Sequence, residues 1–182
     1  MATVKYLALL RGINVGGKNI IKMADLKLCF EKMGFTDVLT FIQSGNVLFA
    51  SNEKNAIKLT AKIEKELSGK FKYRSSVVLI SYIQLRTVVE AAPKGFGKNQ
   101  DAYRYDVVFL KEPLEPGEAL KHVQIKTDIE TASAGKHTLY FSRLICKATQ
   151  GRLVKIISLP VYQNMTIRNW NTTSKLLALM EK

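Results

Sequence analysis

The first half of the chain alternates between the hydrophobic spacing of strands and that of helices. Residues 6–10 form an apolar run, which predicts a buried strand. Four apolar residues then recur at helical spacing: Met23, Leu26, Phe30 and Met33. The β-rich runs 38–43 and 47–50 predict two strands, the apolar stripe within 57–67 predicts a second helix, and residues 76–80 predict a fourth strand. The predicted order is strand, helix, strand, strand, helix, strand.

The same pattern restarts in the second half. A capping box at Ser81 and Gln84 begins a helix that Pro93 ends. Residues 93–102 are rich in Gly, Pro and polar side chains and lack periodicity, so we expect a linker there. The elements predicted beyond it are a strand over 105–110, a short helix over 114–123, strands over 123–131 and 137–142, a helix over 149–159, and a last helix capped by Thr172.

This repeated order predicts an α+β fold. We expect two ferredoxin-like units (α-β plait, split βαβ), each with an antiparallel sheet and helices on one face. The first unit is predicted over residues 1–92 and the second over 103–182, with 93–102 between them. The two halves share no obvious residue identity, so the repeat is one of pattern.

Charge is the most unusual bulk property of these 182 residues, whose formal net charge is +13. Such a charge favours acidic partners, for example nucleic acid, anionic membrane surfaces or phosphorylated ligands. It is spread through both halves, without the basic tail of a dedicated nucleic-acid anchor. Lys54, Lys58 and Lys62 follow one another at helical spacing and suggest a basic helix face.

Several features predict a cytoplasmic protein that does not enter a membrane. No apolar run approaches the ~18 residues that a membrane span needs. Residues 1–10 lack a small-residue cleavage site and indicate a strand rather than a signal peptide. Cys29 and Cys146 have no Cys-x-x-Cys or Cys/His neighbour, so we expect buried free thiols in a reducing compartment.

Motifs for chemistry are incomplete throughout the chain. Gly12, Gly17 and Lys18 match part of a phosphate-binding loop, but Asn19 replaces the hydroxyl that would bind Mg²⁺. Residues 94–97 match the opening of an RNA-recognition signature, whose aromatic continuation is missing. The two histidines, His122 and His137, have no partner at metal-ligand spacing. We therefore assign no catalytic residue, and predict no metal and no cofactor.

Topology nevertheless brings two glycine-containing turns together. In a ferredoxin-like sheet, strands one and two run parallel with strand three between them, so the loop after strand one and the hairpin between strands two and three share one edge. The residues that meet there define a pole, and they are Arg11, Asn14, Gly16, Gly17, Lys18, Ser44, Gly45 and Asn46. Exposed backbone N–H groups and arginine bind phosphate or carboxylate well, so the pole is a candidate ligand site.

A second polar cluster precedes the last predicted helix. Residues 166–172 contain Arg168 and Trp170 among asparagines and threonines that can cap a helix. A helix N-terminus attracts anions, so Arg168 is a candidate addition to the ligand site. An apolar anchor at Trp170 with Asn and Thr as caps is the alternative interpretation.

At these residues the sequence resembles a widespread bacterial family described as a domain of unknown function. Its members begin with Arg-Gly-Ile-Asn-Val-Gly-Gly, carry Ser-Gly-Asn in a hairpin and end near Thr-Ile-Arg-Asn-Trp, and the three motifs stand here at 11–17, 44–46 and 166–170. The resemblance implies two ferredoxin-like units, in agreement with the hydrophobic pattern. It supplies no activity, substrate, cofactor or catalytic residue.

The function that the sequence favours is the binding of a small anionic or phosphorylated ligand at the pole. Two alternatives stay open: weak, sequence-independent nucleic-acid binding through the basic surface, and an enzyme that acts on a phosphorylated substrate. Whether the chain is an enzyme, and its oligomeric state, do not follow from the sequence.

Overall fold

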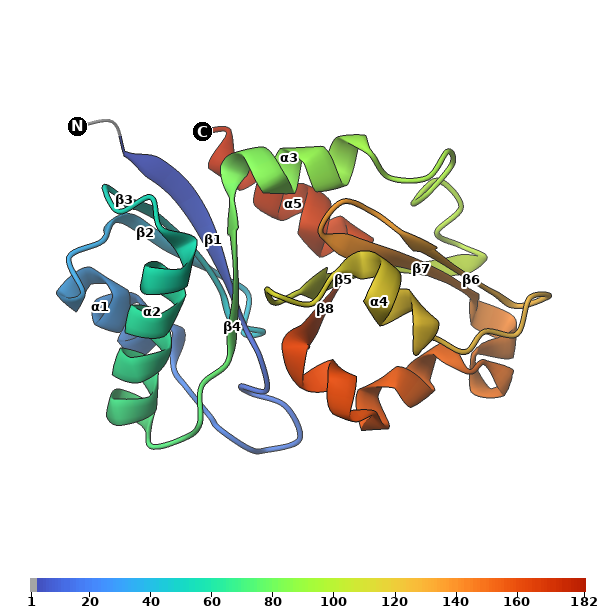
Figure 1. Ribbon diagram of the computed structural model, residues 1–182, viewed down its shortest axis with the longest axis horizontal. Coiled ribbons are helices and arrows are strands. Elements are labelled where there is room, and N and C mark those ends of the chain that lie inside the picture. Colours follow the sequence, from blue (N-terminus) through green and yellow to red (C-terminus); the bar gives the residue numbers. More distant parts are fainter. Residues whose placement is uncertain (1–2) are drawn as a thin grey trace. The chain divides into compact units, whose positions relative to one another are not determined.

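The computed structural model describes residues 3–182 and divides into two compact units, one ending at Ile83 and one spanning Gln84–Lys182. Each unit contains a four-stranded antiparallel sheet (Figure 1). The protein is therefore α+β with two ferredoxin-like units, as the hydrophobic pattern predicts. Within residues 3–182, no helix combines the length and the apolar character that crossing a membrane requires.

The first unit follows the predicted order closely. Its elements are β1 (Val4–Leu10), α1 (Met23–Lys32), β2 (Thr36–Phe41), β3 (Asn46–Ser51), α2 (Ala56–Phe71) and β4 (Val77–Ser81). The strands lie in the order β2-β3-β1-β4, and every neighbouring pair is antiparallel. Because β1 and β2 are both antiparallel to β3, they run parallel to each other, which brings their carboxyl ends to one edge of the sheet.

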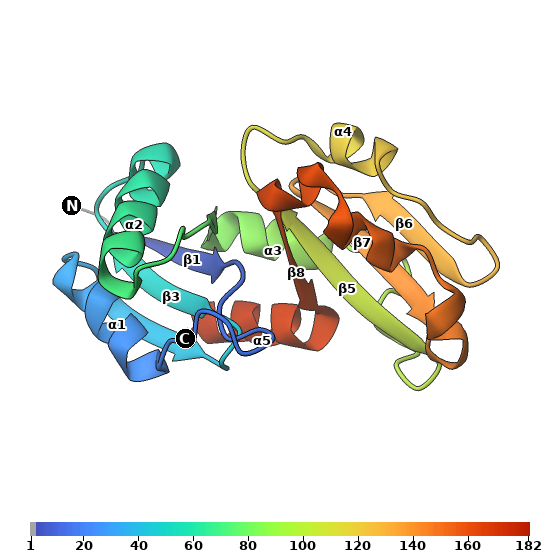
Figure 2. The ribbon, with the colours of Figure 1, turned by 90° about the horizontal axis from the view of Figure 1, so that it is seen from below.

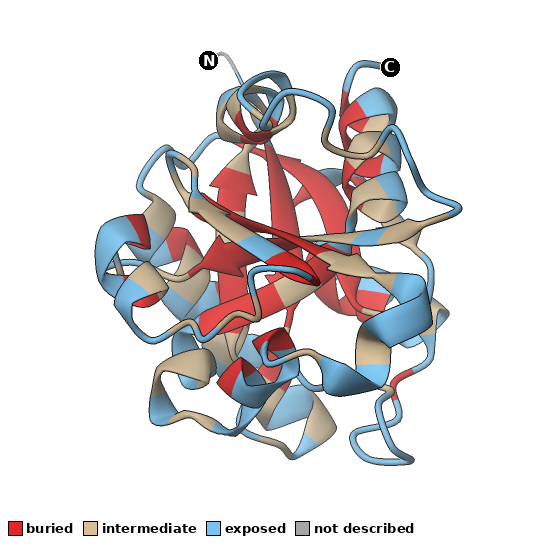
Figure 3. Ribbon diagram, turned by 90° about the vertical axis from the view of Figure 1, so that its right-hand side faces the viewer, coloured by how far each residue is buried: buried red, intermediate tan, exposed pale blue. Residues whose placement is uncertain are grey.

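The core of the first unit lies between this sheet and helices α1 and α2, which cover one of its faces (Figures 1 and 2). The ring of Phe49 on β3 packs 4.4 Å from that of Phe35 and 5.4 Å from that of Phe30, measured between centroids. Buried residues are concentrated in the strands and on the inward sides of the helices (Figure 3). Burial of these apolar side chains is the main stabilisation of the unit.

The second unit repeats the sheet topology. Its elements are α3 (Tyr82–Glu90), β5 (Tyr103–Leu110), α4 (Pro116–Lys121), β6 (Glu130–Ala134), β7 (Thr138–Leu144), β8 (Met165–Asn169) and α5 (Trp170–Met180). The strand order β6-β7-β5-β8 matches that of the first unit. Helix α3 begins at the boundary between the units.

Several predictions for the second unit are wrong. The helix expected over 149–159 is replaced by three 3-10 segments, η1 (Ile145–Gln150), η2 (Leu153–Ser158) and η3 (Pro160–Asn164). Gly151 is extended and Pro160 lacks a backbone donor, so a continuous α-helix cannot run through this region. Leu153 and Ile156 are buried at the three-residue spacing of a 3-10 turn.

Further errors concern the bounds of one strand, a strand that was not predicted, and the cap of the last helix, which was expected at Thr172. The strand expected over 123–131 lies at Glu130–Ala134, because residues 126–130 form a turn in which the Ile129 and Glu130 N–H groups both donate to the Lys126 carbonyl. Residues 165–169, for which no strand was predicted, form β8. The last helix begins at Trp170, and its cap is Asn169, whose side chain accepts from the Thr172 N–H at 2.7 Å.

The segment expected to be a linker is packed into the second unit. Phe96 lies edge-on to Tyr105, Tyr140 and Trp170, at centroid distances of 4.9, 5.3 and 5.1 Å. The Tyr140 hydroxyl donates to the Val88 carbonyl at 2.6 Å, which ties α3 to the same unit. The second unit therefore begins near residue 84, earlier than the predicted 103.

The packing of the aromatic cluster predicts that residue 97 must be glycine. Gly97 and Gly95 both have positive φ, but a Cβ on Gly97 would overlap the Trp170 indole whereas one on Gly95 would meet nothing. We expect Gly95→Ala to lower the free energy of unfolding by about 1–2 kcal/mol through backbone strain, and Gly97→Ala to lower it clearly further. Urea unfolding of both variants measures the difference. Equal losses would contradict the packing of residues 93–102 against Trp170.

Candidate functional site

The loop after β1 is folded around the side chain of Asn14. Its carboxamide nitrogen donates to the Ile21 carbonyl at 3.1 Å and to the Gln43 carbonyl at 2.8 Å, and its oxygen accepts from the Ile21 N–H at 2.8 Å. The backbone of Asn14 is left-handed, with φ +52°, a conformation that asparagine tolerates better than most residues. One side chain thus closes the loop and joins it to the β2–β3 hairpin.

The hairpin turn packs tightly against the same loop. The Leu10 N–H donates to the Gly45 carbonyl at 2.8 Å, and a Cβ on Gly45 would lie 2.8 Å from both the Leu10 Cβ and the Ile13 Cδ1. Asn46 is wholly buried, and its side chain donates to the Phe41 carbonyl and to the Ser44 hydroxyl at 2.9 and 3.0 Å. Gly45 is therefore required by the close packing of the turn against the loop, and Asn46 by the hydrogen bonds that close the hairpin.

The tip of the loop is exposed, in contrast to its base. The Lys18 N–H donates to the Val15 carbonyl at 3.1 Å, and the two residues between them, Gly16 and Gly17, both have positive φ. Positive φ at both central positions is typical of a type I′ turn. The backbone amides of Gly16 and Gly17 donate to no residue within 3–182, and both glycines face solvent.

Cations gather around the pole. Arg11 follows β1 directly, and its N–H donates to the Ser76 carbonyl at 2.9 Å, which brings the segment 72–76 beside it. The segments 11–22, 41–46 and 72–76 contain no aspartate or glutamate, and their basic residues are Arg11, Lys18, Lys22, Lys72 and Arg74. The Glu64 carboxylate of α2 accepts from the neighbouring Val77 N–H at 2.7 Å, so cations still outnumber carboxylates in this region.

Arg168 lies in the second unit, on β8, with its side chain buried. Its guanidinium donates to the Thr166 hydroxyl and to the Ile167 carbonyl, both at 2.8 Å. Burial lowers the pKa of Arg168 to about 10, and the group stays charged at neutral pH. Within the first unit, the loop and the hairpin meet as the topology predicts.

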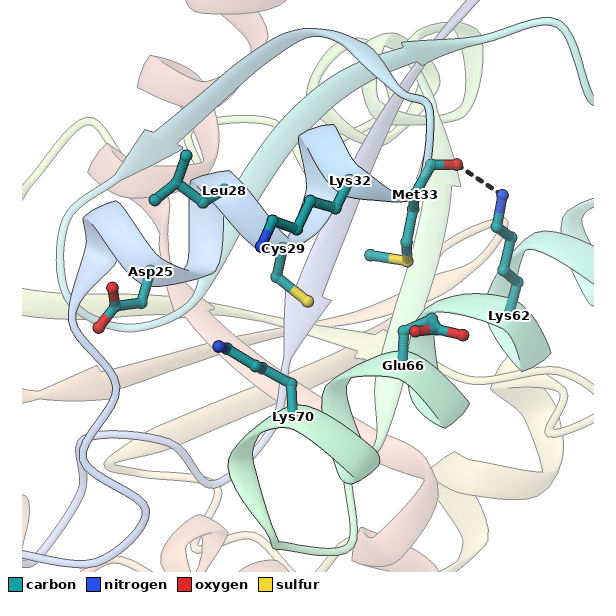
Figure 4. A pocket seen from close by; sticks show the side chains of 8 residues that line it. All are labelled: Asp25, Leu28, Cys29, Lys32, Met33, Lys62, Glu66 and Lys70. Atoms are coloured by element: carbon teal, nitrogen blue, oxygen red, sulfur yellow. Dashed lines mark hydrogen bonds between the residues drawn. The ribbon is translucent and has the colours of Figure 1, made fainter.

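A groove between α1 and α2 is a concave surface of the first unit, with a volume of about 330 Å³ (Figure 4). Lys32, Lys62 and Lys70 line it together with Asp25 and Glu66, so its charge is mixed. The Lys62 ammonium donates to the Met33 carbonyl at 2.6 Å and lies 5.2 Å from the centroid of the Phe35 ring. Lys54 precedes α2, so the predicted row of three helical lysines does not form.

Cys29 lies at the base of this groove. Burial is the main cause that raises the pKa of its thiol and Glu66 adds to the shift, although Lys70 and Lys32 oppose it. The thiol is therefore protonated at neutral pH and is a weak nucleophile. Cys146, expected to be buried, is exposed because it lies on η1 instead of an apolar helix face. Within residues 3–182, no three His, Cys, Asp or Glu side chains are grouped to hold a metal ion.

Comparisons with known proteins agree with this fold. A family model described as "Protein of unknown function (DUF1697)" matches residues 3–140. A solved structure, described as that of conserved bacterial protein SP0830 from Streptococcus pneumoniae, is similar with a TM-score of 0.85 and 27% identity, over 98% of this chain and 99% of that chain. No functionally curated protein matches. Neither description names an activity.

The hydrogen bonds of Asn14 predict how much stability is lost when its side-chain N–H donors are removed. Asn14→Asp keeps the oxygen that accepts from the Ile21 N–H but loses both donated bonds, one of them to Gln43 across the hairpin. We expect the free energy of unfolding to fall by about 1–3 kcal/mol, the typical cost of leaving such groups unpaired. Chemical denaturation measures the change.

Asn19→Asp is the matched control. Asn19 also has a positive φ, but it is exposed and donates one side-chain bond, to the Gly12 carbonyl at 2.9 Å. Both substitutions add the same charge at a residue with positive φ. Asn19→Asp removes only one exposed bond, so we expect it to lower the free energy of unfolding less than Asn14→Asp. If the two variants lose equal stability, Asn14 does not have the joining role assigned to it.

Proposed function

This chain belongs to the DUF1697 family of proteins of unknown function, and we propose that it binds a small anionic or phosphorylated ligand at the pole. The observation that supports the proposal is the excess of cations over carboxylates around two turns that are fixed to each other. The Asn14 side chain joins those turns, so their geometry exists before a ligand arrives. A site that needs no ordering on binding loses less conformational entropy.

Different residues of the pole have different roles in this proposal. Gly16, Gly17 and Lys18 face solvent and offer backbone N–H groups and an ammonium to the anion. Arg11 adds a guanidinium, and its backbone N–H is bonded to Ser76, the residue before β4. Asn14, Ser44, Gly45 and Asn46 position the two turns and hold the hairpin closed. Arg168 lies on β8 of the second unit, and its addition to the site stays a prediction from the sequence.

Lys18→Ala tests the proposal without disturbing the scaffold. A thermal-shift screen of inorganic phosphate, nucleotides, sugar phosphates and dicarboxylates identifies ligands by the rise in melting temperature. For any ligand found, we expect Lys18→Ala to weaken binding about ten- to a hundredfold, the effect of losing a charge-assisted hydrogen bond. The melting temperature without ligand should barely change, since Lys18 is exposed.

Lys65→Ala is the matched control, because it removes the same charge from an exposed position on α2. If both variants weaken binding equally, the ligand responds to net charge and not to the pole. If neither variant weakens binding, the pole is not the site.

An enzyme differs from a binding module by turnover. A panel of phosphatase, nuclease and ATPase assays should therefore show no activity if the chain only binds.

A second candidate function, weak nucleic-acid binding, is favoured by the net charge of +13. We expect binding without sequence preference, in which the logarithm of the affinity falls with the logarithm of salt by roughly 0.9 for each phosphate contacted. Titration of labelled DNA and RNA at two salt concentrations measures this slope. Tight, sequence-selective binding that survives raised salt would contradict this second candidate function.

A cytoplasmic location also stays a prediction from the sequence.

A further inference from the structure

The second unit carries a cavity of about 400 Å³ where β5, β7 and β8 meet the 3-10 segment η2. Its polar lining includes Arg104, Asp106, Arg143 and Asn169. Its apolar wall comes from the same strands and from η2, through Phe141, Leu153, Val154, Ile157 and Ile167. The volume lies within the range of about 300–1,000 Å³ that is usual for small-molecule sites. No residue of the pole belongs to it.

Two arginines stand directly opposite each other in this cavity. Arg104 on β5 and Arg143 on β7 are paired in the antiparallel register, so both project from the same face of the sheet. Like charges at such positions are destabilising. The guanidinium of Arg143 has no hydrogen bond or ion pair with any residue in 3–182.

The carboxylate that the register places beside Arg143 is already used elsewhere. Glu130 on β6 is paired with Arg143 but is almost wholly buried. Its two oxygens accept backbone N–H bonds from Lys126, Arg152 and Leu153 at 3.1, 2.7 and 3.1 Å, and these bonds anchor the start of η2. Arg143 is therefore left to face the cavity, and a planar guanidinium is suited to a carboxylate or phosphate.

Asp106 adds an acceptor beside these cations. Its Oδ2 accepts from the Arg104 Nε at 2.9 Å, whereas its Oδ1 is buried and has no hydrogen-bond partner among the residues described. Buried polar atoms are rarely left unpaired, so a donor is missing here. Asn169 uses its oxygen to cap α5, and its amide nitrogen makes no hydrogen bond within 3–182.

We propose that this cavity binds a small carboxylic acid that carries an ammonium or hydroxyl group beside its carboxylate, together with an apolar side chain. Apolar α-amino acids are the simplest members of this class. Arg143 and Arg104 take the carboxylate, and Asp106 Oδ1 accepts from the ammonium or hydroxyl. The apolar wall covers the side chain. The adjacency of Arg104 and Asp106 matches the adjacency of opposite charges on an α-amino acid.

Ligands that lack one feature at a time test the proposal on the unmodified chain. Isothermal titration calorimetry is carried out with phenylalanine, leucine, phenyllactate, phenylpropionate and phenethylamine. Phenylalanine, leucine and phenyllactate should bind saturably. Phenylpropionate lacks the donor and phenethylamine lacks the carboxylate, so each should bind about ten- to a hundredfold more weakly than phenylalanine.

Two variants locate the site. Arg143→Met keeps an unbranched apolar stem and removes the charge, so phenylalanine should bind at least about tenfold more weakly. The melting temperature of this variant without ligand should not fall, because the opposition with Arg104 is relieved. Asp106→Asn should weaken phenylalanine more than phenyllactate, since an amide no longer attracts an ammonium. Lys155 lies on η2 but does not line the cavity, so Lys155→Met is the control and should leave binding unchanged.

The proposal is overturned if none of the five compounds gives saturable heat at millimolar concentration, or if all five bind alike. Binding that survives Arg143→Met unchanged places the ligand elsewhere and overturns it equally. These outcomes are separate from those at the pole, because the panel contains no phosphate and the variants leave residues 11–46 intact.

Discussion

The carboxamide of Asn14 is the contact on which the pole of the first unit depends. Three hydrogen bonds from this one side chain close a loop that would otherwise be free to take many conformations, and one of them reaches across to the β2–β3 hairpin. Fixing a loop costs about 1–2 kcal/mol of backbone entropy per residue. The side chain offsets part of this cost before any ligand binds. The glycines and lysine at the tip are thereby presented on a fixed base.

Much of the backbone arrangement at the pole follows from the pattern of the sequence. The alternation of strand and helix spacing predicts the order of elements, and the order implies that the loop after β1 and the β2–β3 turn share an edge. The roles of individual residues do not follow in the same way. Asn46 is a polar residue beside a turn glycine, and the sequence offers no signal that it is wholly buried with its amide inside the hairpin. Burial of that kind depends on packing between distant segments.

The second unit shows where local pattern fails. Leu153 and Ile156 fit either an α-helix or a 3-10 turn, and the choice is made by the extended Gly151 and by the Glu130 carboxylate, which binds the backbone at the start of η2. Three short segments cover the sheet where one helix was predicted. Arg104 and Arg143 lie opposite each other because of the register between β5 and β7. They are 39 residues apart in the sequence, so the pattern of the sequence does not predict this pairing. The two ferredoxin-like units therefore share a topology and differ in the surfaces that they expose.

Chemical-shift mapping of inorganic phosphate on the whole chain tests the anion site at the pole most directly. Amide proton–nitrogen correlation spectra recorded during the titration report each backbone N–H separately. The amides of Gly16, Gly17 and Lys18 should shift together and saturate with one affinity, while those of the α1–α2 groove stay in place. Shifts spread evenly over the lysine-rich surface, or confined to residues outside the pole, would contradict a preformed anion site there.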